Sequence, residues 1–554
     1  MRGFDNYGYR SRYGCGDRTQ FTLADYPERI PGLCLRVAVK GRPISRSRSA
    51  IRFMTTAHIV LDADFIISEL DRRVFGSFIE HLGRCVYTGI FEPEHPTADK
   101  HGFRQDVLDL VRDLGPTIIR YPGGNFLSGY NWEDGVGPIE QRPARLDLAW
   151  LSTEPNRFGT NEFVEWCRAA GTEPMLGVNL GTRGPDEARQ FLEYCNHPGG
   201  TYLSELRAKH GYPQPHGVKF WCLGNEMDGP WQICQKTATE YGRTAAETAK
   251  VMKLVDSSVQ LAACGSSHRD MPTFGAWEYE VMEHTFDRVD FLSLHMYYQN
   301  PYNDVLEFLG NIEIMDRFIK EAAAVCDAVA AKRRSAKRMM LSFDEWNVWY
   351  KARSTPDMEP QNWPFAPRLI EEIYDLQDAL MVGGALITLI NNADRVKAAC
   401  LAQLVNVIGA IYAEPGGPAW RQTIFHPFKL ASQYGRGSVL RSNVRSGCYS
   451  TKTAADSAQL LAASIHDPED RKIVLFLLNR STDTPTDLSI DLRGFAPVQE
   501  GKVLVLHGKD LLATNSAAAP RRLEPSEHAE LLLHPDKVST QLPPLSWNTL
   551  VLSC

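Results

Sequence analysis

The chain has 554 residues, 43% of them hydrophobic, which is enough to bury a large core in several domains or in one barrel with an appendage. Its 60 basic and 67 acidic residues give a net charge of −7, which argues against a nucleic-acid partner because no overall positive field attracts phosphates. The longest apolar run, about Ala379 to Ile390, is shorter than the roughly 20 residues of a membrane span, and we expect a buried strand there.

The cysteines and the first residues bear on the compartment. Twelve cysteines lack Cys-x-x-Cys spacing, and no early segment resembles a signal peptide, so we expect a cytoplasmic protein with free thiols. Residues 1–53 are rich in Arg and Gly without an apolar period, which predicts an extension with no fold of its own. A transit peptide is the alternative, although acidic residues argue against it: Asp5, Asp17, Asp25 and Glu28.

The patterned part of the chain begins with extended segments. Residues 54–70 carry Ile59, Leu61, Phe65 and Ile67 as inward-facing candidates. After them, eight apolar runs are predicted to be strands: Val74–Ile79, Thr117–Tyr121, Pro174–Leu180, Val218–Leu223, Gln260–Cys264, Phe291–His295, Met339–Phe343 and Ala385–Ile390.

Helical patterns lie between these strands, namely Phe103–Leu114, Thr160–Ala170, Pro185–Cys195, Thr237–Val255, Asp304–Ala331 and Pro367–Met381. Strands that alternate with helices pair in parallel through right-handed crossovers. Eight such units close most naturally into a (β/α)8 TIM barrel, which we place at residues 71–415.

The sequence changes in character after Glu414. Short strands with turn signals follow, and Leu460–Ile465 with Lys472–Leu478 predicts a hairpin. Residues 416–554 are therefore expected to form an all-β sandwich. Residues 54–70 are expected to add strands to it, because a chain that starts and ends outside the barrel can pair its two ends there.

In a barrel of this kind the reactive groups sit where strands end and the following loops begin. Polar side chains fall at these positions on most of the predicted strands: Glu80, Arg120, Asn125, Asn179, Asn225, Glu226, His268, His295, Tyr297, Glu345 and Trp346. A purely structural protein would have little use for such a ring.

Glu226 and Glu345 stand out because they end the fourth and seventh predicted strands, on nearly opposite walls of one opening. Glycoside hydrolysis needs such a pair, since one carboxyl protonates the leaving oxygen while the other attacks the anomeric carbon. A separation of about 5–5.5 Å would give retention and about 6.5–9.5 Å inversion. A lone Glu at a strand end is more often a rim residue or helix cap, so the hypothesis depends on the pair and on Asn225, whose amide can hold a sugar hydroxyl.

The remaining candidates are weaker on pattern alone. His295 by itself predicts a hydrogen-bonded core histidine, whereas Tyr297 faces the same way and could donate a hydrogen bond to Glu345. Asp344 alternates to the opposite face from Glu345 and is expected to be structural. Trp150 and Trp349 are as compatible with core packing as with stacking on a sugar. No cluster has metal-ligand spacing, so neither a metal nor a cofactor is expected.

Six segments together resemble the α-L-arabinofuranosidases of glycoside hydrolase family 51. They occur in the same order as in that family and extend over the chain from about Ala57. The segments are Phe78-Ile79-Glu80-His81-Leu82-Gly83-Arg84, Arg120-Tyr121-Pro122-Gly123-Gly124-Asn125-Phe126, Gly129-Tyr130-Asn131-Trp132-Glu133-Asp134-Gly135, Gly224-Asn225-Glu226-Met227-Asp228-Gly229-Pro230-Trp231, His295-Met296-Tyr297-Tyr298 and Asp344-Glu345-Trp346-Asn347-Val348-Trp349-Tyr350.

The resemblance implies a retaining exo-hydrolase that removes terminal arabinofuranosyl groups from arabinan, arabinoxylan or oligosaccharides. It implies Glu226 as general acid/base and Glu345 as nucleophile. It also implies a sugar pocket lined by Glu80, Asn125, Asn225, Tyr297 and Gln403, with Trp150 and Trp349 near its entrance. Family members are commonly homohexamers. Residues before Met54 carry no family motif.

Two other functions remain open at this point. An endo-acting glucanase or xylanase could use the same carboxylate pair, with an open cleft in place of a closed pocket. A carbohydrate-binding protein without activity would need one carboxylate to be lost or misplaced, yet both are present.

Overall fold

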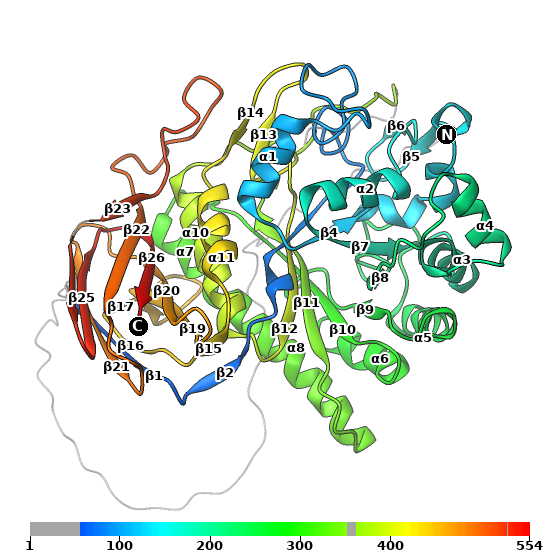
Figure 1. Cartoon of the computed structure of the whole chain (residues 1–554). Coiled ribbons are helices and arrows are strands. Elements are labelled where there is room, and N and C mark those ends of the chain that lie inside the picture. Colours follow the sequence, from blue (N-terminus) through cyan, green and yellow to red (C-terminus); the bar gives the residue numbers. More distant parts are fainter. Residues whose placement is uncertain (1–55, 352–361, 529) are drawn as a thin grey trace, which may run out of the picture. The chain divides into compact units, whose positions relative to one another are not determined.

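The computed structural model describes residues 56–351, 362–528 and 530–554, and the prediction for residues 1–53 lies outside them. Eight parallel strands form a closed barrel, in the order β10-β11-β12-β3-β4-β7-β8-β9 (Figure 1). They are β3 (Gly76–Phe78), β4 (Ile118–Tyr121), β7 (Glu173–Val178), β8 (Phe220–Leu223), β9 (Gln260–Cys264), β10 (Phe291–Tyr298), β11 (Met340–Val348) and β12 (Val396–Leu401). The predicted (β/α)8 barrel is confirmed.

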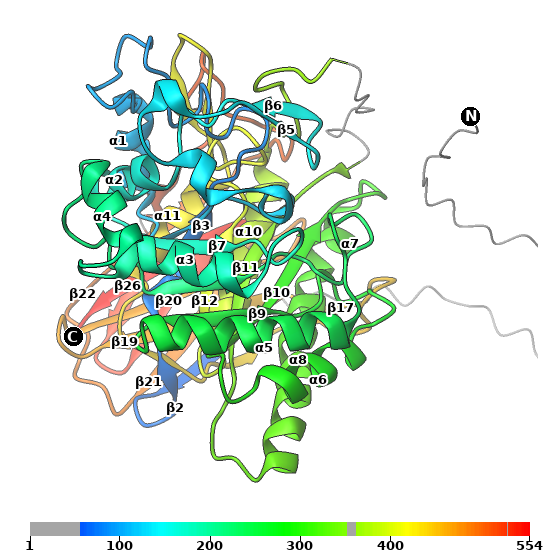
Figure 2. The same cartoon turned by 90° about the vertical axis from the view of Figure 1, so that its right-hand side faces the viewer.

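Helices cover the outside of the barrel, and Figure 2 shows α3, α5 and α6 beside one another there. Their bounds are α1 (Gln105–Leu114), α2 (Thr160–Ala170), α3 (Pro185–Asn196), α4 (Tyr202–Lys209), α5 (Ala238–Val255), α6 (Ala276–Thr285), α7 (Val305–Gly310) and α8 (Ile312–Arg333). Gly115 and Gly171 end α1 and α2 with φ of 72° and 75°, which glycine adopts without the Cβ clash of other residues.

The eighth strand was predicted in the wrong place. The apolar run Ala385–Ile390 belongs to the helix α10 (Leu376–Asn391), and the strand is Val396–Leu401. α10 contacts β11 and β12 of the barrel on one side and strands of the sandwich on the other (Figure 1). Because the helix is buried all around, its sequence lacks the polar stripe by which a helix is recognised.

The rest of the chain forms a β-sandwich. One sheet has five strands in the order β16-β1-β21-β25-β24, and the other has seven in the order β2-β15-β19-β20-β26-β22-β23. The strands are β1 (Thr56–Asp62), β2 (Ile66–Glu69), β15 (Ser438–Leu440), β16 (Asn443–Arg445), β19 (Leu460–Asp467), β20 (Lys472–Asn479), β21 (Thr486–Arg493), β22 (Glu500–Leu506), β23 (Ser526–His528), β24 (Leu531–His534), β25 (Lys537–Leu542) and β26 (Ser546–Ser553).

The two ends of the patterned chain meet in this sandwich, as predicted. β1 pairs in parallel with β21, and β2 pairs with β15. Ile59 and Leu61 are fully buried in the core between the sheets, but Phe65 is 60% exposed because it lies in the turn between β1 and β2. The helix α11 (Phe425–Tyr434) and the strand β25 were not predicted.

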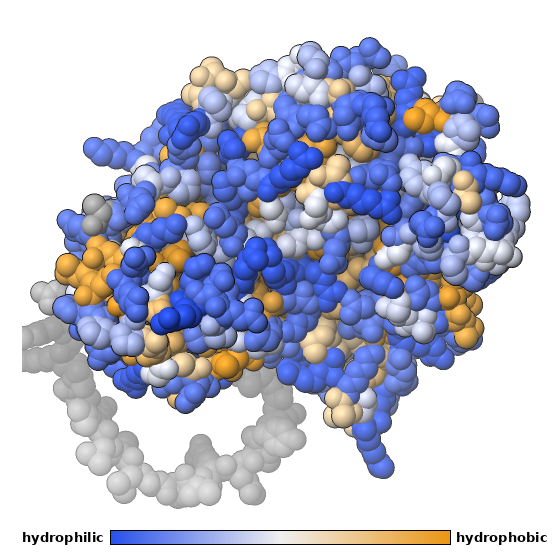
Figure 3. Space-filling model, viewed as in Figure 1, coloured by the Kyte–Doolittle hydropathy of each residue, from blue (hydrophilic) through white to orange (hydrophobic). Residues whose placement is uncertain are grey.

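Short strand pairs complete the described chain: β5 (Arg145–Asp147) with β6 (Ser152–Glu154), β13 (Ile411–Ala413) with β14 (Ala419–Arg421), and β17 (Cys448–Tyr449) with β18 (Ser457–Ala458). Hydrophilic side chains cover most of the face in Figure 3, with hydrophobic ones in small groups. Among the described helices, none combines the length and apolar character needed to cross a membrane.

Candidate active site

The predicted site residues gather at the carboxyl ends of the barrel strands. Glu80 follows β3, Arg120 lies in β4, Asn125 begins the 3-10 turn after β4, and Asn225 and Glu226 follow β8. His295 and Tyr297 lie in β10, Glu345 and Trp349 lie in and just after β11, and Gln403 follows β12. Trp150 reaches the same region from the β5–β6 hairpin, where its indole donates to Glu80.

Glu226 is held in a conformation that residues other than glycine seldom adopt. Its φ is 44°, and Gly224, two residues earlier, has a φ of 91°, so the chain turns sharply as it leaves β8. The Glu226 side chain is buried and accepts two hydrogen bonds, from Trp231 Nε1 to Oε2 at 2.5 Å and from His295 Nδ1 to Oε1 at 3.0 Å. Burial raises the pKa of Glu226, but His295 and Trp231 outweigh it and bring that pKa below its ordinary value.

Glu345 is fixed from both sides. Arg120 Nη1 donates to Oε1 at 2.6 Å, and the Tyr297 hydroxyl donates to Oε2 at 2.9 Å. Burial and the charge of Glu345 raise the pKa of Tyr297 well above its usual range, so the phenol keeps its proton and remains a donor. A guanidinium and a phenol thus hold both oxygens of Glu345 and fix its orientation, as a nucleophile requires.

His295 lies between the two glutamates. Its Nδ1 is 3.0 Å from Glu226 Oε1 and 3.5 Å from Glu345 Oε2. Burial alone would lower the pKa of His295, but the carboxylates of Glu345, Asp344 and Glu226 raise it to about 10. At neutral pH the ring is therefore an imidazolium.

One oxygen of Glu226, one oxygen of Glu345 and a ring nitrogen of His295 lie within 4.8 Å of one another, close enough for three ligands of one metal ion. Their contacts are already accounted for without a metal. The protonated imidazole bonds to Glu226, and the Arg120 guanidinium pairs with Glu345. The three groups instead resemble a compact acid–base set.

An amide network adjoins the carboxylates. Arg120 Nη2 donates to Asn225 Oδ1 at 2.6 Å, and the Asn225 amide lies 3.4 Å from the side-chain oxygens of both Asn125 and Gln232. Arg120 thus holds Glu345 and Asn225 at once. Sequence patterns indicated Asn225 and Asn125, but Gln232 was missed because it belongs to an irregular loop.

Glu80 is the centre of a third group. Phe126 N and Trp150 Nε1 donate to its Oε1 at 3.0 and 2.9 Å, and Gln403 Nε2 donates to Oε2 at 2.9 Å. Burial raises the pKa of Glu80 to about 8, with the charge of Glu345 adding to the effect. The structure therefore places Glu80, Trp150 and Gln403 together, although pattern alone did not single out Glu80 or Gln403.

Aromatic rings border the carboxylates. Trp349 packs edge-on against Tyr297, with ring centroids 5.2 Å apart. The Trp349 ring is half-buried, and its Nε1 is a buried donor without a protein partner among the described residues. A half-buried ring with a spare donor suits a polyhydroxylated ligand.

The prediction for Asp344 was wrong about its face. Asp344 is fully buried inside the barrel, with Oδ1 3.4 Å from His295 Nε2 and Oδ2 3.7 Å from Arg120 Nε. The register of β11 shifts against both neighbours near this residue, so strict alternation fails there. Asp344 and Glu345 consequently approach the same histidine.

The loop after Glu226 supplies a residue to which the sequence assigned no role. Trp231 returns five positions later to donate to Glu226, while its ring is 49% exposed. Asp228 anchors this loop by accepting hydrogen bonds from Ser267 N and Oγ, as expected of a loop-orienting residue. Asn179 bonds to the Tyr130 carbonyl and to Thr182, which makes it structural.

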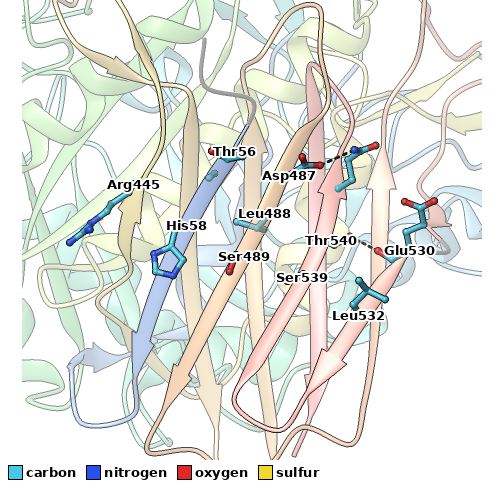
Figure 4. A pocket seen from close by; sticks show the side chains of 12 residues that line it. Thr56, His58, Arg445, Asp487, Leu488, Ser489, Glu530, Leu532, Ser539 and Thr540 are labelled. Atoms are coloured by element: carbon cyan, nitrogen blue, oxygen red, sulfur yellow. Dashed lines mark hydrogen bonds between the residues drawn. The ribbon is translucent and has the colours of Figure 1, made fainter. Parts of the chain in front are cut away.

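A pocket of about 650 Å³ lies elsewhere, on the outer face of the five-stranded sheet (Figure 4). Side chains of β1, β21 and β25 line it, among them His58, Asp487 and Gln541. None of the predicted site residues lines this pocket. Its position on the sandwich separates it from the carboxylates at the barrel strand ends.

Comparisons with known proteins agree with this geometry. Residues 110–318 match the family model described as "Alpha-L-arabinofuranosidase 1 domain", and residues 344–546 match "Alpha-L-arabinofuranosidase C-terminal domain". The intracellular exo-α-(1→5)-L-arabinofuranosidase 1 of Bacillus subtilis is 52% identical over 499 residues, covering 90% of this chain and 99% of that protein.

Two proteins of Bifidobacterium longum are also similar. An exo-α-(1→6)-L-arabinofuranosidase is 48% identical over 512 residues, covering 89% of this chain and 96% of that protein. The solved structure of AbfB, a family 51 α-L-arabinofuranosidase, has a TM-score of 0.85 at 43% identity, covering 90% of this chain and 99% of that one.

Proposed function

The chain belongs to the glycoside hydrolase family 51 α-L-arabinofuranosidases, and from that premise we propose which of its residues carry the reaction and how. The protein is an exo-acting α-L-arabinofuranosidase, which hydrolyses terminal non-reducing α-L-arabinofuranosyl residues of arabinan, arabinoxylan and arabino-oligosaccharides. Glu226 is its general acid/base and Glu345 its nucleophile. The single observation that carries this assignment is the approach of the two carboxylates around His295.

The proposed reaction is a double displacement with retention. Glu345 attacks the anomeric carbon while Glu226 protonates the leaving oxygen, and a water activated by Glu226 then releases the sugar from Glu345. The support is the short gap between the carboxylates, since one oxygen of Glu226 lies within 4.8 Å of one oxygen of Glu345, which favours the close pair of a retaining enzyme over the wider pair of an inverting one.

The other residues bind and orient the sugar in this proposal. Glu80, Asn125, Asn225, Tyr297 and Gln403 present polar atoms to the furanose hydroxyls. Trp150 and Trp349 border the entrance, and Arg120 and His295 support the carboxylates. This division follows the contacts above, since Arg120 and His295 are almost fully buried against Glu345 and Glu226.

Hydrolysis of p-nitrophenyl α-L-arabinofuranoside tests the activity. We expect Glu345→Ala to lose turnover by a factor of about 10⁴ or more, because no covalent intermediate can form. Glu226→Ala should retain hydrolysis of activated aryl glycosides and be accelerated by azide, an anionic nucleophile that attacks the anomeric carbon without a base, releasing Glu345 and forming the glycosyl azide. Full activity in Glu345→Ala would refute the assignment.

The same preparation separates the alternatives. An endo-glucanase or xylanase would cleave internal bonds of linear β-glucan or β-xylan and release shorter chains. The proposed exo enzyme releases only arabinose, from the ends of α-(1→5)- or α-(1→6)-linked oligosaccharides. A binding protein without activity would give a heat of binding with arabino-oligosaccharides and no product.

Three further predictions complete the proposal. A cytoplasmic location is favoured by the word "intracellular" in the name of the Bacillus subtilis relative.

A homohexamer is favoured by the family resemblance, and sedimentation equilibrium tests it. The domain division at residues 1–53, 54–70, 71–415 and 416–554 is testable by limited proteolysis, which should cut first near the boundaries.

A further inference from the structure

A third carboxylate lies directly behind the two glutamates, and the reaction described above gives it no part. Asp344 is completely buried, and its oxygens approach His295 Nε2 at 3.4 Å and Arg120 Nε at 3.7 Å. Ser293 Oγ donates to Asp344 Oδ1 at 2.5 Å, and the Cys222 thiol donates to Oδ2 at 3.5 Å. Burying a charge is costly, so the negative charge of Asp344 must be offset by these four partners.

Five charged groups alternate in sign through the barrel, three carboxylates and two cations. His295 touches Asp344 with Nε2 and Glu226 with Nδ1, while Arg120 touches Asp344 with Nε and Glu345 with Nη1. Asp344 is thus the shared counter-ion of the two cations that hold the two glutamates. The arrangement Asp344–His295–Glu226 has the order of a carboxylate, an imidazole and a group that exchanges a proton.

An acid in the first step of the reaction needs a proton, yet Glu226 in this environment favours the carboxylate form. The proton within reach is the one on His295 Nδ1, 3.0 Å from Glu226 Oε1. Glu226 and His295 therefore share one proton across this hydrogen bond, and whatever fixes the charge of the imidazole fixes the proton supply of Glu226.

We propose that Asp344 is a positioning residue that keeps His295 protonated, so that His295 can pass a proton through Glu226 to the leaving group. This inference depends on the proposed function. In glycosylation the proton passes from His295 through Glu226 to the glycosidic oxygen, the sugar bonds to Glu345, and the alcohol leaves. In deglycosylation water attacks the anomeric carbon, Glu345 departs as a carboxylate, and the water's proton returns through Glu226 to His295. No net charge is gained or lost in either half.

Among the described residues, Asp344 is the carboxylate paired with His295 Nε2, and no other lies there. The titratable and charged groups that face these residues are Arg120 from β4, Cys222 from β8, Cys264 from β9, Tyr297 from β10, Glu345 from β11, Cys400 from β12, and Asp228, His268 and Lys351 from the loops. The thiols are uncharged because burial raises the pKa of Cys264 to about 12 and those of Cys222 and Cys400 well above the usual range. Removing the charge of Asp344 therefore leaves that side of the imidazolium without a counter-ion.

The test compares Asp344→Asn with Ser293→Ala in the full chain. Asp344→Asn removes a negative charge next to the shared proton, so the basic limb of kcat/KM should move to lower pH, by at least about one pH unit. Ser293→Ala removes neutral hydrogen bonds to Asp344 and to His295 Nε2 but keeps the charge of the aspartate, so its basic limb should move much less than that of Asp344→Asn. Equal, pH-independent losses in the two variants would mean that Asp344 is only structural and would overturn the proposal.

A second measurement does not depend on activity or on the folding of Asp344→Asn. With ¹³C at Cε1 of all histidines, the signal absent from His295→Gln identifies His295 in the wild-type protein. That signal should keep the imidazolium shift up to pH 9, whereas a neutral imidazole at pH 7.5 would overturn the proposal. If wild-type protein shows this titration but does not cleave arabinofuranosides, the proposed function fails while the Asp344–His295 pair stands.

Discussion

At the scale of single residues, the site works because each carboxylate has a different set of partners. Glu345 is paired with a permanent cation, whereas Glu226 is paired with an imidazole that can give up its proton. Arg120 cannot lose its charge at any physiological pH, so Glu345 always faces a cation. Two glutamates of identical chemistry are thereby set to different roles.

Trp231 offers a test of the Glu226 environment. Its indole donates to Glu226 Oε2 at 2.5 Å and so stabilises the carboxylate. Trp231→Phe keeps an aromatic ring but removes the donor, which should raise the pKa of Glu226 and move the basic limb of kcat/KM to higher pH. This is the direction opposite to that expected for Asp344→Asn.

Measurement of kcat/KM against pH on an aryl α-L-arabinofuranoside checks the sign. Because hydrogen bonds to charged groups contribute about 1.5–3 kcal/mol, kcat/KM of Trp231→Phe should fall by roughly ten- to a hundredfold. A variant with wild-type kcat/KM and an unmoved limb would show that the indole does not act on Glu226.

At the scale of elements, α10 explains why the eighth barrel strand was predicted in the wrong place, and it imposes one packing constraint. The run from Ala379 to Ile390 was predicted as a strand because every side of it is apolar, and a helix buried between two layers has no polar face to reveal its period. Only the position of α10 in the tertiary structure, packed against both the barrel and the sandwich, distinguishes a buried helix from a buried strand here.

The parts that the sequence predicted well share one physical cause. Strand ends that carry Glu226 and Glu345 were found because parallel barrels place reactive groups there, and this placement does not depend on exact strand bounds. The face of Asp344 was missed because a register irregularity in β11 breaks alternation, and alternation is all that a sequence offers. Contacts such as Trp231 with Glu226 arise from loop shape, which local patterns do not encode.

Gly383 should be intolerant of even a methyl group. A Cβ at Gly383 would lie 2.5 Å from Cε3 of the rigid Trp547 ring, whereas a Cβ at Gly384 would meet the flexible end of Ile312. Gly383→Ala should therefore lower the free energy of unfolding by about 1–3 kcal/mol, although alanine is the better helix former.

Gly384→Ala, one position along the same helix, is the matched control. The end of Ile312 can move aside, so the helix propensity of alanine should offset most of the cost in this variant. Urea unfolding of both proteins measures the difference. Equal stabilities would show that α10 and β26 are less tightly packed than the structure indicates.

At the scale of the whole molecule, buried acids make stability depend on pH. Burial raises the pKa of Glu80 to about 8 and of Asp147 and Asp228 to about 7, and their neighbours raise that of His295 to about 10. For each group the folded chain holds a proton that the unfolded chain has already lost. Stability contributed in this way falls as pH rises through the interval between the unfolded and folded pKa.

We therefore expect the unfolding temperature to fall steadily from pH 6 to pH 9. Each group contributes a slope of up to about 1.4 kcal/mol per pH unit within its own interval. Asp344 acts in the opposite sense, since Arg120 and His295 outweigh burial and lower its pKa to about 2, but that contribution is lost only in strong acid. Differential scanning calorimetry across this range measures the trend.

Glu80→Gln should flatten the slope below pH 8, because glutamine does not titrate. Glu527→Gln, which changes an exposed glutamate of β23, should leave the slope as in the wild type. An unfolding temperature that rises toward pH 9, or an identical slope in Glu80→Gln, would contradict the ionisation scheme.

The proposed mechanism requires that the Glu345 carboxylate bonds to the sugar. Glu226→Ala treated with 2,4-dinitrophenyl α-L-arabinofuranoside should form the glycosyl-enzyme quickly and hydrolyse it slowly, since the activated leaving group needs no acid but the water still needs a base. Mass spectrometry of the quenched protein should then find one arabinofuranosyl group, on the peptide that contains Glu345. Attachment at another residue, or an absence of adduct together with release of inverted β-arabinose, would contradict the account.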